Sequence, residues 1–226
     1  MENPEIRLQQ RSPGFWQHWM LDHSLGDLVM MGGVAGIGRL LLINYSKTIV
    51  AHHGGKFSWL VWLVAGVVEG LLIGYIEWRS IRKLIRLAPG AWISLTVIAA
   101  VGGWLAILSP AIMSISLLSR FTDVHRTYFA IYAAIAGMSF GTLVGAAQYT
   151  VVRKSFKNAV FWIFANAMAW MFSLIIIYSG IAFFGSSSFT NILITVGTCI
   201  LSGLIQGLIT GLCLHYAMPM RSKSVV

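Results

Sequence analysis

Glu69 lies in the middle of a long apolar stretch and is the strongest candidate for chemistry in this chain. A charged side chain at the centre of a bilayer costs about 2.5 to 3.5 kcal/mol on insertion scales, so such a residue usually has a partner or a task. Arg39, on the preceding apolar stretch, is the nearest candidate partner. Three interpretations follow: a structural Arg39–Glu69 pair, a site for a transported proton or cation, or a protonated and hydrogen-bonded Glu69.

The positions equivalent to Glu69 in two related segments carry Phe140 and Gln206. A cation pore built from equivalent segments would keep the acidic group in each of them, so this pattern disfavours a channel. We therefore group Arg39, Glu69 and Gln206 as candidate intramembrane polar residues, without a ring of carboxylates.

A second set of polar and aromatic residues stands near the ends of the same segments. Glu77 and Gln148 each precede an aromatic residue and are followed within about one turn by arginines. We expect them to bond to those basic side chains at the membrane boundary, where amphipathic aromatic rings also gather. The predicted interfacial residues are Glu77, Trp78, Gln148, Tyr149 and His215.

Metal and enzyme signatures are weak or missing. His52, His53 and His125 lie in expected outer loops, where imidazoles could bind zinc or copper or stay solvated. The chain has no HExxH pair, no nucleotide-binding glycine loop and no paired intramembrane aspartates. We therefore assign no catalytic or metal-binding residue, name no cofactor and expect a protein that is not an enzyme.

The elements that position these residues are long and apolar. Hydrophobic residues make up 57% of the 226-residue chain and charged residues 10%, a balance that indicates a bilayer protein. About 20 helical residues cross a hydrocarbon core. Six stretches reach that length, at about 26–45, 57–78, 90–109, 128–150, 159–184 and 189–217.

Three of these stretches carry a ladder of glycines at every fourth position, with successive ladders about 70 residues apart. Glycines at this spacing form a groove along a helix, which allows close packing against another helix in lipid. The pattern predicts an all-α integral membrane protein of six transmembrane helices, built from three tandem helical-hairpin repeats with pseudo-threefold symmetry. The predicted packing positions are Gly66, Gly70, Gly74, Gly137, Gly141, Gly145, Gly203, Gly207 and Gly211.

The predicted organisation is a single membrane domain with short flanks. Residues 1–25 are expected to form an N-terminal segment that lies at the cytoplasmic interface, because Pro13 suits a helix start and aromatic residues follow it. The six-helix domain covers 26–217, and 218–226 form a cytoplasmic tail. The three repeats cover about 26–86, 90–157 and 159–217.

Basic residues are distributed unequally between the two predicted sides. Eleven of the Lys and Arg residues lie on the side of both termini, whereas four lie on the other side. This asymmetry predicts that both termini are cytoplasmic. The same asymmetry accounts for the net charge of +9 without a nucleic acid partner. Attraction to anionic lipid headgroups is its expected by-product.

The runs GTLVGAAQYTVVRK and GLLIGYIEWRSIRK resemble an element of bacterial multi-span membrane proteins, in which glycine-spaced helices end in Gln or Glu, an aromatic residue and Arg. The resemblance covers the even-numbered stretches and departs from the pattern between Gln206 and His215. It implies a location in the bacterial inner membrane and implies close helix packing, but no activity.

The leading functional expectation is an accessory or scaffold subunit that packs against another membrane protein within the lipid bilayer. The alternative is a small transporter or permease subunit with an intramembrane polar site around Glu69. The loops are too short for an extramembrane catalytic or receptor domain, and the sequence does not name a substrate.

Overall fold

The computed structural model describes residues 13–29, 58–85, 87–108, 125–183 and 189–218. These residues form six α-helices and no strand, which confirms the all-helical prediction. Two helices continue into a π-helical turn, η3 after α6 and η4 after α10. The elements are α2 (Pro13–Asp27), α5 (Ser58–Ile81), α6 (Pro89–Gly103), η3 (Trp104–Leu108), α8 (His125–Val152), α9 (Phe161–Phe183), α10 (Phe189–Leu212) and η4 (Cys213–Ala217).

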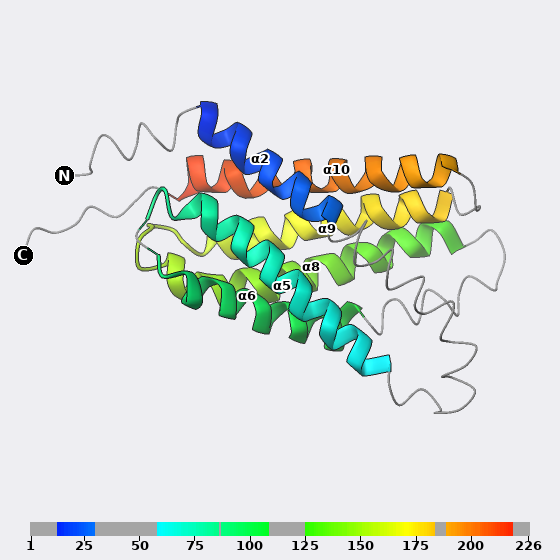
Figure 1. The fold of residues 1–226 in the computed structure, drawn as a ribbon, viewed down its shortest axis with the longest axis horizontal. Helices are drawn as coiled ribbons and strands as arrows, with labels where there is room; N and C mark the ends of the chain where they lie inside the picture. The colour runs from blue at the N-terminus through cyan, green and yellow to red at the C-terminus, as the bar shows by residue number, and fades with distance from the viewer. Residues whose placement is uncertain (1–12, 30–57, 86, 109–124, 184–188, 219–226) are drawn as a thin grey trace, which may run out of the picture.

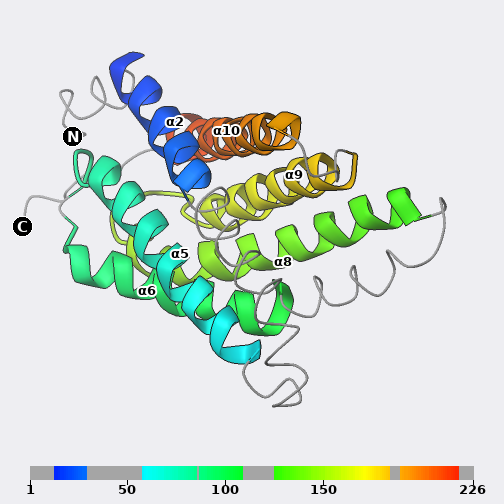
Figure 2. The ribbon, with the colours of Figure 1, turned by 45° about the vertical axis from the view of Figure 1, so that its right-hand side comes forward.

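The six helices pack in a closed order. Each helix contacts the next one along the chain, and α10 closes the circuit by packing against α2. Helices α8, α9 and α10 run side by side, whereas α2 and α5 cross them obliquely (Figures 1 and 2). Each helix therefore has two helical neighbours, and the side chains between them form a shared interior.

The glycine ladders lie where helices approach most closely. A Cβ atom added at Gly70 of α5 would stand 2.4 Å from the Cα of Val97 in α6. At Gly141 of α8 it would stand 2.2 Å from the carbonyl oxygen of Asn166 in α9. Backbone atoms cannot move aside as flexible side chains do, so both positions require the absence of a side chain.

The third ladder contacts the N-terminal helix. A Cβ atom at Gly203 of α10 would lie 2.5 Å from the carbonyl oxygen of His23, and one at Gly207 would lie 2.8 Å from the Cα of Met20. Trp19 of α2 is fully buried. The structure packs this segment along α10, where small residues make room for its backbone; its place at the membrane interface stays a prediction.

Three tryptophans fill the interior near one end of the bundle. Trp19, Trp92 and Trp162 come from α2, α6 and α9 and are fully buried. The ring centroid of Trp162 lies 6.4 Å from that of Trp19 and 6.3 Å from that of Trp92. Edge-to-face and tilted aromatic contacts at such distances are favourable. This aromatic cluster fixes the spacing of three helices beside the polar groups described below.

The connections α5–α6 and α8–α9 lie at the same end of the bundle as the start of α2 and the end of η4 (Figure 1). The α8–α9 connection includes Asn158, whose φ is 53°. This is a left-handed backbone conformation, which asparagine tolerates better than most residues. Exposed basic side chains gather in and beside the two connections. They are Arg79, Arg82, Lys83, Arg153, Lys154 and Lys157.

Three helical segments of the described chain are long and apolar enough to cross a bilayer, which supports an integral membrane protein. They are Pro89–Ile107, Ala130–Val152 and Val196–Ala217, whereas the apolar part of α9, Phe161–Ile177, is shorter. The sequence predicted six such segments. Most of the first, 26–45, lies outside the described residues.

Candidate functional site: a polar interior

The interior of the bundle holds polar side chains that are almost completely shielded from solvent. Five helices contribute a carboxylate or an amide: Asp27 from α2, Glu69 and Glu77 from α5, Gln148 from α8, Asn166 from α9 and Gln206 from α10. Each is at most 4% exposed. Burial of such groups is costly unless they are hydrogen-bonded, so their partners define what the interior can do.

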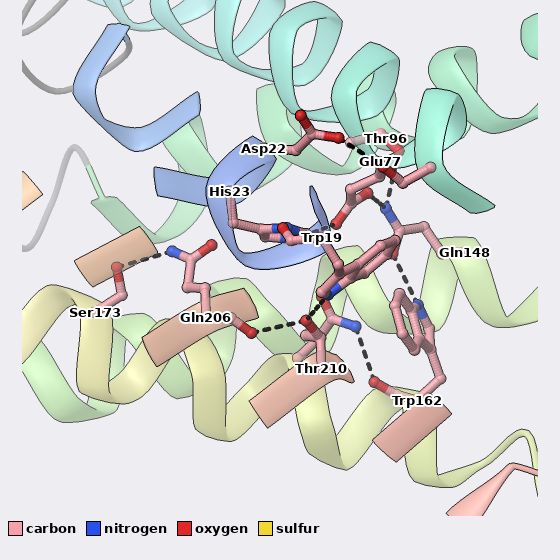
Figure 3. A network of polar contacts seen from close by, with 12 residues as sticks. Trp19, Asp22, His23, Glu77, Thr96, Gln148, Trp162, Ser173, Gln206 and Thr210 are labelled. Carbon is pink, nitrogen blue, oxygen red and sulfur yellow. Dashed lines mark hydrogen bonds and ion pairs between the residues drawn. The ribbon is translucent and has the colours of Figure 1, made fainter. Parts of the chain in front are cut away.

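Gln148 is the centre of the first cluster, which joins four helices. Its Nε2 donates to Glu77 Oε2 at 2.5 Å and to Thr96 Oγ1 of α6 at 3.0 Å. Its Oε1 accepts from Trp162 Nε1 of α9 at 2.8 Å. Figure 3 shows the amide between these three partners. Both ends of the amide are therefore bonded. Because the carboxylate accepts and the indole N–H donates, these two partners identify the amide nitrogen and oxygen.

The structure gives Glu77 and Gln148 different partners from those expected. They are bonded to each other inside the bundle, whereas the sequence suggested arginine partners at the membrane boundary. The basic side chains instead cover the aromatic neighbours: the Arg82 guanidinium lies 4.5 Å from the ring centroid of Trp78, and that of Arg153 lies 5.9 Å from Tyr149. A turn of helix separates the two environments.

Trp78 and His215 also make defined contacts. Trp78 Nε1 donates to the carbonyl oxygen of Leu87 at 3.0 Å and so braces the α5–α6 connection. The partly buried His215 ring contacts the rings of Trp16 and Tyr216, with centroids 5.2 and 4.2 Å away. Both residues lie at the end of the bundle that carries the basic connections.

Asp27 belongs to a second cluster, formed by α2, α9 and α10. Gln206 Nε2 donates to Ser173 Oγ at 2.8 Å. Ser173 and Ser202 share a short hydrogen bond, and Ser202 donates to Asp27 Oδ2. Because the amide nitrogen only donates and the carboxylate accepts, the hydroxyl hydrogens all point from Gln206 toward Asp27.

Trp19 of α2 is connected to this second cluster through Thr210 and the main chain of Gln206. Its Nε1 donates to Thr210 Oγ1 at 3.0 Å, and the Thr210 hydroxyl donates to the carbonyl oxygen of Gln206 at 2.7 Å. This line of contacts is visible in Figure 3. The polar groups of α2 and α10 are thus part of one connected interior.

Glu69 forms a third polar site. Trp104 Nε1 of η3 donates to Glu69 Oε2, and the Trp104 ring stacks on Trp62 at 5.5 Å. The other oxygen, Oε1, is buried without a hydrogen-bond partner among the residues described. The predicted partner Arg39 lies outside those residues. Glu69 and Gln206, which we grouped from the sequence, bond to different neighbours.

The charge balance of this interior is acidic. Asp27, Glu69 and Glu77 receive their hydrogen bonds from neutral donors. In the described part of the chain, His23 Nε2 lies 3.8 Å from Glu77 Oε1, and the two form an ion pair when His23 is protonated. An unpaired carboxylate at this depth is expensive. The arrangement therefore favours the binding of protons or small cations.

The structure does not test whether the predicted outer-loop histidines bind a metal ion. His52 and His53 lie outside the described residues, and the side chain of His125 at the start of α8 is not described either. Within the described ranges, no group of three or more His, Cys, Asp or Glu side chains is arranged to hold a metal ion.

Sequence reasoning missed His23, Asp27, Ser173 and Ser202, which complete the polar interior. One signal pointed to the part that α2 plays. Both α2 and α6 begin with Pro-Gly and a tryptophan two residues later, in the runs PGFW and PGAW. A helix that starts like α6 was a candidate to pack against a glycine ladder as α6 does.

Comparisons with protein-family models, with curated proteins and with solved structures give no match to this chain. The functional argument therefore rests on the geometry of the polar interior.

Proposed function

We propose that this chain is a small transporter or permease subunit that moves protons or small cations through its polar interior. The observation that carries the proposal is the burial of Asp27, Glu69 and Glu77, each bonded to a neutral donor. Ionisable side chains inside a membrane protein usually mark ion pathways or proton relays. A purely structural role would favour apolar packing, because a buried charge rarely improves stability.

The glycine contacts support a finer proposal for the fold. Each ladder helix packs on one partner, α5 on α6, α8 on α9 and α10 on α2. We propose that these pairs are the three repeats, related by pseudo-threefold symmetry, and that all six helices span the bilayer. The hairpin boundaries then differ from those predicted, because each ladder helix pairs with the following helix and α10 pairs with the N-terminal one.

Flux through vesicles tests the function. Purified protein is reconstituted into liposomes that contain a pH-sensitive dye, and a potassium diffusion potential drives proton entry. The wild type is expected to acidify the lumen faster than empty liposomes. Glu69→Gln is expected to fold, because its amide oxygen still accepts from Trp104, but to reduce the flux to the level of empty liposomes.

The matched control is Asp22→Asn. Asp22 is half-buried on α2 and accepts from Ser80 Oγ at 2.7 Å, a bond that asparagine can keep. Its flux should equal that of the wild type. Unchanged flux in Glu69→Gln together with a stoichiometric second subunit after mild purification would favour the accessory or scaffold role expected from the sequence.

The proposed orientation places both termini and the basic connections in the cytoplasm of a bacterium, with the chain in the inner membrane. Basic residues favour the cytoplasmic side. In cells whose outer membrane has been made permeable and whose inner membrane is closed, an impermeant maleimide should label Ser187→Cys but not Ser155→Cys. Native Cys199 and Cys213 are buried and should contribute little. Labelling of position 155 alone would reverse the orientation.

A further inference from the structure

The hydrogen bond of His23 fixes which ring nitrogen can take up a proton. Nδ1 lies 2.9 Å from the carbonyl oxygen of Trp19, one turn earlier in α2. A carbonyl only accepts, so Nδ1 carries the hydrogen. Nε2 is therefore the titrating atom. It is buried and has no hydrogen-bond partner in the described part of the chain.

Nε2 faces a carboxylate. Glu77 Oε1 lies 3.8 Å away, while its other oxygen is occupied by Gln148. When both groups are deprotonated, two lone pairs face each other in a buried setting, which is unfavourable. One proton removes the conflict, either on Nε2 as an imidazolium or on Glu77 as a carboxylic acid.

A second carboxylate, Asp27, lies about one turn after His23 on α2. Asp27 follows His23 by four residues, so both side chains lie on one face of the helix. The two groups interact electrostatically. Ser202 donates to Asp27 from the α10 side, and this bond holds the carboxylate in position as an acceptor.

The other residues that the structure places against His23 carry no charge. The Trp19 ring lies 4.7 Å from the imidazole, centroid to centroid, and Gly203 and Gly207 of α10 lie against the main chain and Cβ of His23. Asp22, the adjacent residue on α2, accepts from Ser80. Beyond these, Glu69 of α5 and the buried thiol Cys199 of α10 interact electrostatically with Asp27.

We propose that His23, Glu77 and Asp27 form a proton-binding site in which His23 passes one proton between the two carboxylates. The proton leaves the Glu77 carboxyl group for Nε2, and the imidazolium then gives it to Asp27 after the ring turns toward that side. No bond other than O–H and N–H forms or breaks. The direction of transport rests on the proposed function, but proton binding can be measured without it.

Histidine-labelled protein in lipid bilayers tests the site by nitrogen NMR. His23→Gln assigns the signal by its disappearance from among the six histidines. In the wild type, the His23 signal should show a proton on Nδ1 at all pH values and titration at Nε2. In Glu77→Gln, the midpoint should fall by about one pH unit or more, because an adjacent anion favours the charged ring.

Asp27→Asn should lower the midpoint as well, and it provides the same test if Glu77→Gln fails to fold. The control Asp22→Asn should leave the midpoint unchanged. The same midpoint in the wild type, Glu77→Gln and Asp27→Asn would overturn the assignment.

Vesicle flux separates this site from the proposed function. If the midpoint depends on both carboxylates while the wild type carries protons no faster than empty liposomes, the binding site stands and the transport proposal fails. If Glu69→Gln abolishes flux while the His23 titration midpoint is the same in the wild type, Glu77→Gln and Asp27→Asn, the transport proposal stands and the proton-binding site fails.

Discussion

Replacement of Gly203 by alanine is expected to destabilise the protein by about 1 to 3 kcal/mol, the usual cost of overpacking. The added methyl group would lie 2.5 Å from both the carbonyl oxygen of His23 and the Cα of Ser24. To relieve this contact, α2 and α10 must separate. The separation should also weaken the bond between Ser202 and Asp27, because these residues belong to the same two helices. The measurement is the free energy of unfolding in a detergent titration followed by tryptophan fluorescence.

Gly197 provides the matched control on the same helix. A methyl group there meets no atom of the described residues within 4 Å, and alanine has a higher helix propensity than glycine. Gly197→Ala should therefore leave the free energy of unfolding unchanged or raise it slightly. Equal effects of Gly197→Ala and Gly203→Ala would show that the contact between α2 and α10 does not restrain the fold.

The glycine spacing predicts close helix contacts because the requirement is local. Every fourth position of a helix lies on one face, so Gly66, Gly70 and Gly74 indicate a groove without any knowledge of the partner. The identity of the partner depends on tertiary structure. Either neighbour of a ladder helix could fill its groove, and the pairing of α10 with α2 joins the two ends of the chain.

The polar interior was harder to predict for a related reason. The sequence pointed to Glu69 because a single acidic residue interrupts an apolar stretch, whereas His23 and Asp27 lie in a segment of mixed polarity that also suits a membrane interface. Glu77 and Gln148 lie two and five residues before an arginine, yet both side chains are buried in the interior. Sequence distance therefore suggested the wrong partners for both residues.

Gln148→Leu is expected to have the largest effect, a loss of about 3 to 5 kcal/mol in the free energy of unfolding. Leucine fills a similar volume but cannot bond. Glu77 Oε2 would lose its donor and Trp162 Nε1 its acceptor, and both groups are buried. Stability is measured by the same detergent titration.

Thr150→Val on the same helix is the control for Gln148→Leu. Its hydroxyl is exposed and donates only to the local Ala147 carbonyl oxygen, so the change should stay within about 0.5 kcal/mol. A double variant isolates the polar contact itself. Glu77→Leu combined with Gln148→Leu should cost less than the sum of the two single changes, because no unpaired carboxylate remains in the interior. Additive costs would mean that the amide of Gln148 stabilises the bundle without acting on Glu77.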